Sequence, residues 1–191
     1  MTGPETCHMY IAIDRKKDHP DNNGKSVIRQ IIKDPEIDLR IIEEKYRALY
    51  PAKTFRIYHT VNCRSFSKAL RLFKHELIDK DDKFYYRLDS LWRSCLLNPE
   101  AKAENKLLID IDTNNCSIIN EIINEISVCT GARINDRAEI FKEVKTPNGF
   151  HLVTSRFDYR DIADTYPEVE VKKDAYYFVK KVSPGKGGDS E

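Results

Sequence analysis

Two aspartates stand at the end of the apolar run KLLIDIDTNN, which spans residues 106–115. One isoleucine separates Asp110 from Asp112, so in a β-strand both side chains point to the same face. Neighbouring carboxylates repel each other, and burying them unpaired is costly. Divalent cations resolve that conflict because Mg²⁺ prefers carboxylate oxygens. The pair is therefore a candidate metal site. The alternative is a solvated pair in which Asp112 caps the next helix, a place that Thr113 or Asn114 could also take.

His151 is the second candidate, in a strand of otherwise apolar residues directly after the tight-turn sequence PNG of residues 147–149. Gly149 allows the backbone to bend there or to approach a ligand closely. A histidine beside a metal site can hold a phosphate oxygen of a bound nucleotide. The alternative is a histidine on the solvent face of a hairpin.

A charged run before the last apolar strand supplies the third candidate group. It contains three acids and two lysines, which are Glu168, Glu170, Asp174, Lys172 and Lys173. Asp174 opens an apolar strand and could be a third carboxylate for metal ions, with a lysine left to meet phosphate. A charged turn before a strand is the alternative.

The order of these motifs resembles the catalytic core of the archaeo-eukaryotic primase superfamily, which includes primases and primase-polymerases. LLIDID matches the family motif hhhDhD, and Gly149 with His151 matches its small-x-His motif. Asp174 stands for the third, hydrophobic-flanked acid. The distances along the chain are 39 positions from Asp112 to His151 and 23 positions from His151 to Asp174. The resemblance covers Lys106 to about Val182.

This resemblance implies an enzyme that transfers nucleotides from nucleoside triphosphates onto a template-bound primer or an initiating nucleotide. Asp110, Asp112 and Asp174 would hold two Mg²⁺ or Mn²⁺ ions. The implied partners are nucleoside triphosphates, a single-stranded DNA template and a separate helicase or replication protein. Neither a helicase domain nor a zinc-binding insertion is recognisable in the sequence.

Two further groups of residues are assigned to substrate. The residues expected to contact the phosphates of the nucleotide are His151, Lys145, Lys172 and Lys173. The residues expected to contact nucleic acid are Arg56, Tyr58 and Arg64, because cations with an aromatic between them suit a backbone and a stacked base. Arg56 and Tyr58 share one face of a predicted strand.

Other functions remain open. A haloacid-dehalogenase-type phosphatase expects Thr or Val two positions after its second aspartate, where this chain has Asn114. A family-X-type nucleotidyltransferase expects a Gly-Ser pair before its D-x-D, and no such pair precedes Asp110. The stronger rivals are a non-catalytic nucleic-acid-binding accessory protein on a primase-like scaffold and a metal-dependent nuclease that uses the same acids.

The composition predicts a polar globular protein of cytoplasmic or nucleoid-associated type, neither secreted nor membrane-bound. The 191 residues carry a net charge of +1, so any nucleic-acid surface must be a local patch. Five cysteines lie singly, which does not indicate a structural zinc site. No apolar run approaches the roughly 18–20 residues of a membrane span.

Hydrophobic periodicity predicts the elements that position these residues. Predicted strands span Met9–Arg15, Phe55–Asn62, Lys106–Asp112, Ala138–Thr146, Phe150–Phe157 and Ala175–Lys181. Predicted helices span Ser26–Lys33, Asp38–Tyr50, Ser65–Asp79, Tyr85–Leu97 and Asn114–Gly131, the last with Gly131 as its C-cap. Predicted loops span Asp18–Lys25 and Ala163–Val171.

The predicted fold is α+β, with a largely antiparallel sheet. The resemblance adds that the core is like an RNA recognition motif, with an N-terminal αβ unit packed beside it. We divide the chain into an N-terminal αβ and helical unit (1–105), a catalytic core (106–182) and a disordered tail (183–191).

Overall fold

The structure is a computed structural model that describes residues 5–14, 26–78, 86–129 and 137–184. It confirms an α+β protein with antiparallel sheets. The first sheet has the strand order β2-β1-β3-β9, and a short strand β4 also pairs with β1. The second sheet has the order β6-β7-β5-β8.

The first sheet contains β1 (Thr6–Ile13), β2 (Val27–Ile32), β3 (Phe55–Thr60), β4 (Arg64–Ser65) and β9 (Tyr176–Val182). Its helices are α1 (Pro35–Leu49), α2 (Phe66–Ile78), α3 (Leu88–Leu97) and the short η3 (Pro99–Ala101). The second sheet and its helices are β5 (Leu107–Ile111), α4 (Cys116–Val128), β6 (Ile140–Thr146), β7 (Gly149–Thr154), α5 (Arg160–Thr165) and β8 (Val169–Lys172).

The second sheet follows the chain order strand–helix–strand–strand–helix–strand. Read across the sheet, the strands run β8-β5-β7-β6, and every neighbouring pair is antiparallel. This interleaved βαββαβ connection places the first and third strands of the unit, β5 and β7, in the centre of the sheet.

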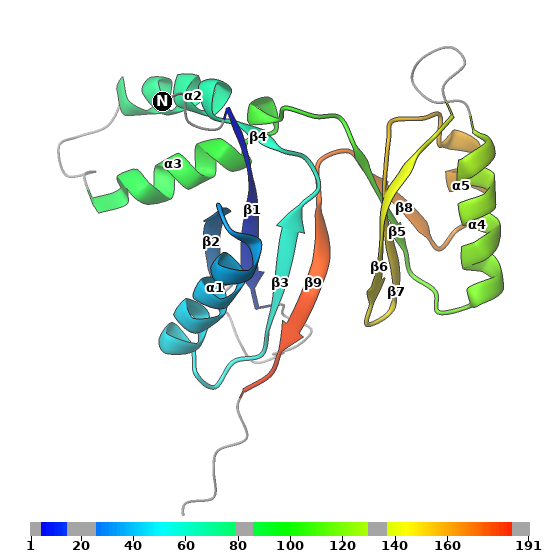
Figure 1. Cartoon of the computed structure of the whole chain (residues 1–191), viewed down its shortest axis with the longest axis horizontal. Helices are drawn as coiled ribbons and strands as arrows, with labels where there is room; N and C mark the ends of the chain where they lie inside the picture. Colours follow the sequence, from blue (N-terminus) through cyan, green and yellow to red (C-terminus); the bar gives the residue numbers. More distant parts are fainter. Residues whose placement is uncertain (1–4, 15–25, 79–85, 130–136, 185–191) are drawn as a thin grey trace, which may run out of the picture.

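The two sheets lie side by side (Figure 1). The first sheet has helices on both faces, because α1 packs on the face of Tyr10 and Ala12, whereas α2 and α3 pack on the face of Cys7 and Met9. Helix α1 packs on the first sheet through Ile42 and Tyr46. Helices α4 and α5 cover the second sheet, where Ile109 and Ile111 of β5 pack against Ile122. The other face of β5 is therefore turned toward the first sheet.

Two crossovers join the sheets, one entering β5 and one leaving β8 for β9. The tripeptide Asn62-Cys63-Arg64, which follows β3, holds both of them. The Asn62 side chain is fully buried and bonds the backbone N–H and carbonyl of Lys106 at 2.7 and 3.2 Å, and the carbonyl of Lys173 at 3.5 Å. The Cys63 carbonyl accepts from Ala103 N–H at 2.9 Å. The predicted unit 106–182 thus supplies the whole second sheet and also β9 of the first.

Most predicted elements are confirmed within a few residues. They correspond to β1, α1, β3, α2, α3, β5, α4, β6, β7 and β9. Helix α1 begins three residues earlier than predicted, because the Asp34 side chain caps it by accepting from the N–H groups of Glu36 and Ile37 at 3.0 Å, with Pro35 in the first turn.

Two predictions are wrong. The predicted helix Ser26–Lys33 is strand β2, which pairs with β1 along its whole length. Four of its six residues are β-branched, and the spacing Val27, Ile28, Ile31, Ile32 fits a helical stripe as well as a strand. The predicted loop Ala163–Val171 contains the end of α5 and most of β8.

Three predictions fall outside the described residues: the loop Asp18–Lys25, the C-cap Gly131 and most of the tail, from residue 185. In the described part of the chain, no helix combines the length and apolar character that a membrane span requires.

Candidate functional site

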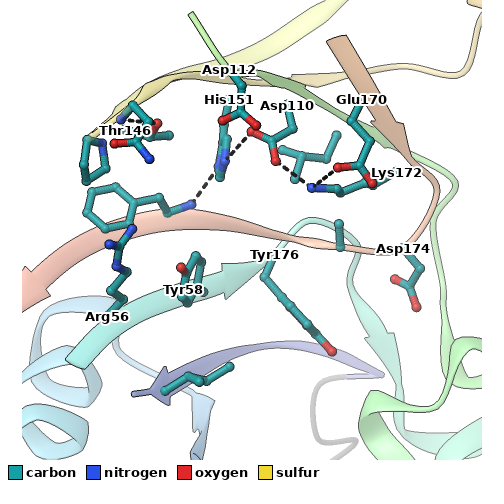
Figure 2. Close-up of a pocket in the computed structure, with 16 residues that line it drawn as sticks. Arg56, Tyr58, Asp110, Asp112, Thr146, His151, Glu170, Lys172, Asp174 and Tyr176 are labelled. Carbon is teal, nitrogen blue, oxygen red and sulfur yellow. Dashed lines mark hydrogen bonds and ion pairs between the residues drawn. The ribbon is translucent and has the colours of Figure 1, made fainter. Parts of the chain in front are cut away.

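A pocket of about 480 Å³ lies between the two sheets. One wall is the open face of the second sheet, with Asp110, Asp112, His151, Glu170 and Lys172. The facing wall comes from β3 and β9, with Arg56, Tyr58 and Tyr176 (Figure 2). Phe178 of β9 and the β6–β7 turn, through Thr146, Pro147 and Asn148, also line the pocket. The volume suits a small-molecule ligand.

Asp110 is at the centre of the second-sheet wall because its two neighbours in the sheet also carry polar side chains. It is the register partner of His151 on β7 and of Glu170 on β8. His151 Nε2 lies 3.1 Å from Asp110 Oδ1. The sheet register therefore assembles His151, Asp110 and Glu170 from three separate motifs into one row.

The first sheet orients His151. The backbone N–H of Phe178 on β9 donates to His151 Nδ1 at 3.0 Å. The β3–β9 register shifts here, since Ile57 pairs with Lys180 but Tyr58 pairs with Phe178. This bulge accompanies the release of the Phe178 N–H toward the pocket. Because Nδ1 accepts, the ring proton lies on Nε2 and is donated to Asp110.

Lys172 bridges two carboxylates in the pocket. Its ammonium Nζ lies 2.6 Å from Asp110 Oδ2 and 2.8 Å from Glu170 Oε2. Burial alone would raise the pKa of Asp110, but hydrogen bonds from His151 and Lys172 outweigh it and lower that pKa to about 2. Burial alone would lower the pKa of Lys172, yet its bonds to Asp110 and Glu170 raise it. Asp110 is thus ionised at neutral pH.

Asp112 does not cap the following helix. The N-cap of α4 is Asn115, whose side chain accepts from the Ser117 N–H at 3.0 Å. Asp112 is exposed and lines the pocket, and its backbone N–H donates to the Glu168 carbonyl at 2.9 Å. The capping alternative for Asp112 is therefore excluded.

Gly149 permits the close approach of the β6–β7 hairpin to the end of β5. A Cβ atom at this position would lie 1.9 Å from the Ile111 carbonyl oxygen and 2.9 Å from the Thr113 nitrogen. Any side chain here would push the hairpin away from the two aspartates. Gly149 is therefore needed for β7 to lie close enough to β5 for Asp110 to pair with His151.

Asp174 lines the pocket but is bound elsewhere. Both of its oxygens accept from the Arg64 guanidinium, at 2.8 and 3.0 Å. The Arg64 side chain is 1% exposed. Its guanidinium therefore has no surface to offer a nucleic acid, and we revise its predicted role: Arg64 pairs with Asp174 between the sheets.

The other predicted contacts divide between the pocket and the far face of the sheet. Arg56 and Tyr58, which share one face of β3, line the pocket. Lys145 is exposed on β6, and the alternation of the strand turns it away from Thr146, which lines the pocket. Lys173 likewise lies next to Lys172 in sequence but lines a separate cavity.

Glu170 lines the pocket, but from the sequence we chose Asp174 over Glu168 and Glu170 as the third acid. Assigning Ala163–Val171 to a loop hid the strand alternation of VEVK, in which Val169 and Val171 pack on the core and Glu170 and Lys172 face the pocket. Tyr176 and Phe178 were missed for a similar reason, since the strand partner of β9 was unknown.

The pocket acids are neighbours without converging on one point. Within residues 5–14, 26–78, 86–129 and 137–184, the ligand atoms of three Asp, Glu, His or Cys side chains come within 4.8 Å of one another only at His8, Cys63 and Glu104, outside the pocket. In comparisons with known proteins, no protein-family model, curated protein sequence or solved structure matched this chain.

Proposed function

We propose that the pocket binds a nucleoside triphosphate with two divalent cations and catalyses nucleotidyl transfer, as a primase or primase-polymerase does. The observation that carries this proposal is the set of three acids on one sheet face, Asp110, Asp112 and Glu170, beside His151 in a pocket of about 480 Å³. Hard divalent cations and phosphate oxygens suit such a set of groups.

The connectivity supports a core like an RNA recognition motif. The βαββαβ order, with strands arranged β8-β5-β7-β6, leaves one sheet face free of helices, and the candidate residues lie on that face. The first sheet, with α1 on its outer side, corresponds to the αβ unit expected beside such a core. A ligand held between them contacts both.

The Lys172 ammonium bridges Asp110 and Glu170, so these two carboxylates already hold one cationic group between them. In this proposal, metal ions would displace that ammonium. We therefore assign Mg²⁺ or Mn²⁺ to Asp110, Asp112 and Glu170, and no longer to Asp174, whose oxygens Arg64 occupies. Such ions supply activation of an attacking hydroxyl and neutralisation of the leaving pyrophosphate.

The remaining side chains suit the nucleotide. His151 presents an Nε2–H donor, and Lys172, once displaced from Asp110, presents an ammonium group to phosphate. Arg56 on the facing wall adds a second cation, and Tyr58 and Phe178, which contact each other edge to face, offer rings for a base. A single-stranded template and a separate helicase or replication protein remain predictions.

A product assay tests the function. Purified protein receives Mn²⁺, labelled nucleoside triphosphates and single-stranded DNA, with and without a primer. We expect products longer than the input strand. The double variant Asp110→Asn with Asp112→Asn should lose this extension while keeping the wild-type circular dichroism spectrum. Asp164→Asn, an exposed acid on α5, serves as the matched control and should extend normally.

Other products would point to the rival functions. Shortened DNA that depends on Asp110 and Asp112 would indicate a metal-dependent nuclease. Unchanged DNA that is still bound by the protein would indicate a non-catalytic accessory protein. Undiminished extension by the double aspartate variant would remove the pocket from the reaction.

A further inference from the structure

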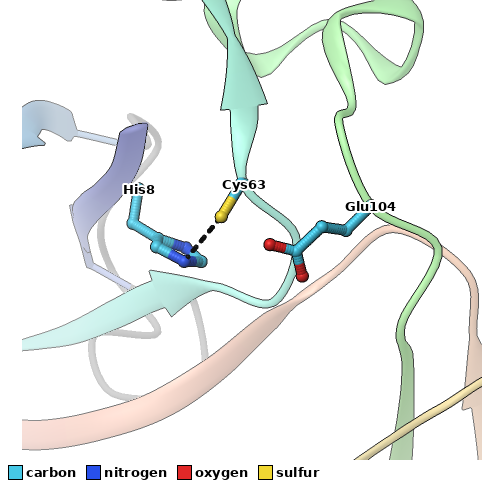
Figure 3. A group of neighbouring side chains, drawn as sticks. All are labelled: His8, Cys63 and Glu104. Carbon is cyan, nitrogen blue, oxygen red and sulfur yellow. Dashed lines mark hydrogen bonds between the residues drawn. The ribbon is translucent and has the colours of Figure 1, made fainter. Parts of the chain in front are cut away.

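A second cluster of metal-type ligands lies outside the pocket, where the crossover into β5 passes the first sheet. It consists of His8 on β1, Cys63 after β3, and Glu104 in the segment between η3 and β5 (Figure 3). The three ligand atoms lie within 4.8 Å of one another, and all three residues are half-buried. They are distant in sequence, so the fold has brought them together.

The histidine is held in the orientation of a metal ligand. His8 Nδ1 lies 3.1 Å from the Thr60 carbonyl oxygen and 3.2 Å from its hydroxyl. A carbonyl can only accept, so Nδ1 carries the ring proton and donates it to Thr60. The lone pair of Nε2 then points to Cys63 Sγ, 3.0 Å away. Metal-binding histidines are oriented by the same kind of backbone contact on the other ring nitrogen.

The neighbours of Cys63 and Glu104 also restrict their movement. The Cys63 carbonyl accepts from the Ala103 N–H at 2.9 Å, which fixes the residue next to Glu104. Lys106 forms an ion pair with Glu104 Oε2. Cys63 and Glu104 thus lie on two segments that a backbone hydrogen bond joins. His8 lies on β1 of the first sheet.

The triad does not suit nucleophilic catalysis. Burial, and then the hydrogen bond and negative charge of Glu104, raise the pKa of Cys63 to about 11. Burial also lowers the pKa of His8. A Cys–His pair of this kind lacks the stable thiolate that a nucleophilic cysteine needs.

We propose that His8 Nε2, Cys63 Sγ and the Glu104 carboxylate bind a zinc ion that fastens the crossover into β5 to the first sheet. One imidazole, one thiolate and one carboxylate form a neutral set with Zn²⁺, which accepts all three ligand types in tetrahedral geometry. Water completes the coordination. The thiol proton is released to solvent when the ion binds.

Binding requires only a small movement of Cys63 and His8 relative to each other. Zinc bonds of about 2.3 Å to sulfur and about 2.0–2.1 Å to nitrogen place tetrahedral ligands about 3.6 Å apart. Cys63 Sγ and His8 Nε2 are 3.0 Å apart in the structure, so they separate by about half an ångström. A rotation of the Cys63 side chain can supply that distance and leaves the His8–Thr60 contact in place.

The experiment measures metal content and thermal stability of the full-length protein. Protein prepared in zinc-supplemented medium without chelators should contain about one zinc ion per chain. Replacing zinc with Co²⁺ should give the visible bands of tetrahedral cobalt and a near-ultraviolet thiolate-to-cobalt band. A strong chelator should lower the melting temperature of the wild-type protein, and added zinc should restore it.

Variants assign the ligands. Cys63→Ser should abolish the thiolate-to-cobalt band, and His8→Gln or Glu104→Gln should abolish stoichiometric zinc. Cys116→Ser, at an exposed cysteine outside the cluster, is the matched control and should bind zinc like the wild type. Wild-type protein that takes up neither zinc nor cobalt, or a thiolate-to-cobalt band that persists in Cys63→Ser, would overturn the proposal. The wild-type chelator experiment decides the question even where a variant fails to fold.

Discussion

Lys172 determines the charge around the pocket carboxylates Asp110 and Glu170. Its ammonium bridges Asp110 and Glu170, so its one positive charge offsets part of the negative charge of the two carboxylates. In the proposed two-metal site, a divalent cation would have to displace Lys172, and the released lysine would then be available to the nucleotide.

Lys172→Met should therefore have opposite effects on the two ligands. Affinity for Mn²⁺ alone should rise by about tenfold, since charged hydrogen bonds contribute about 1.5–3 kcal/mol each. Affinity for a nucleoside triphosphate should fall by a similar factor. Titrations followed by electron paramagnetic resonance for Mn²⁺, and by fluorescence for a labelled triphosphate, measure both. Lys173 lines a separate cavity, so Lys173→Met should change neither the Mn²⁺ affinity nor the nucleotide affinity. A loss of both affinities in Lys172→Met would contradict this role.

Glu170 and Asp174 are distinguished by what their removal does. Glu170→Gln should reduce nucleotidyl transfer strongly while leaving the free energy of unfolding nearly unchanged, because Glu170 is exposed. Asp174→Ala should instead destabilise the fold by about 3 kcal/mol, since it leaves the buried Arg64 charge without its carboxylate. Urea unfolding and extension assays separate the two effects. Asp158→Ala, at an exposed ion pair, is the stability control. Full activity in Glu170→Gln would return Asp174 to consideration.

At the scale of elements, the β6–β7 hairpin must pack tightly against the end of β5. Gly149→Ala places a methyl group against the Ile111 carbonyl oxygen. We expect a loss of about 2 kcal/mol in the free energy of unfolding, together with weaker nucleotide binding, because His151 moves with the hairpin. Asn148→Ala, in the same turn but exposed, should change stability little. Equal stability of Gly149→Ala and the wild type would show that the hairpin does not need this contact.

The start of α1 gives a prediction about pH. Burial alone would raise the pKa of Asp38, but the Lys33 and Asp34 N–H groups and the Gln30 side chain lower it overall. A lowered folded-state pKa stabilises the protein above the ordinary aspartate pKa of about 3.9, and this contribution is lost as pH falls below it and through the folded-state value.

Asp38→Ala should therefore destabilise the protein by about 2 kcal/mol at neutral pH. The difference in unfolding free energy between the variant and the wild type should shrink as the solution is acidified below the ordinary pKa of aspartate. Denaturant unfolding at several pH values measures it. Glu36→Ala, an exposed acid in the same turn, should show a much smaller effect. A difference that stays constant with pH would contradict the assignment.

Prediction from the sequence succeeded for elements with a long, one-sided apolar pattern. Helix α4 repeats isoleucine at helical spacing, and β5 is a short apolar run after a loop. It failed at β2 and β8, which are short and owe their conformation to pairing with β1 and β5. A local pattern cannot specify a partner strand. Because β8 was not predicted, the sequence did not show that Glu170 and Lys172 share one face of a strand.

At the scale of the molecule, the pocket arises from how the two sheets meet. Asp110 and His151 both lie on the second sheet, and their sequence motifs could be recognised without the structure. Arg56, Tyr58 and Phe178 come from the other sheet, and β9 returns to it only after the last crossover. The tripeptide Asn62-Cys63-Arg64 holds these crossovers through Lys106, Lys173 and Asp174. Contacts between such distant segments set the pocket, so local patterns could not predict it.

The most direct test of the two-metal assignment is a titration of the protein with Mn²⁺ in the presence of a non-hydrolysable nucleoside triphosphate, followed by electron paramagnetic resonance. The wild-type protein should bind about two Mn²⁺ ions per chain together with the nucleotide. Asp110→Asn and Glu170→Gln should each lose this nucleotide-dependent binding, while Asp164→Asn keeps it. Mn²⁺ and nucleotide binding that is the same in Asp110→Asn as in the wild type would contradict a metal site in this pocket.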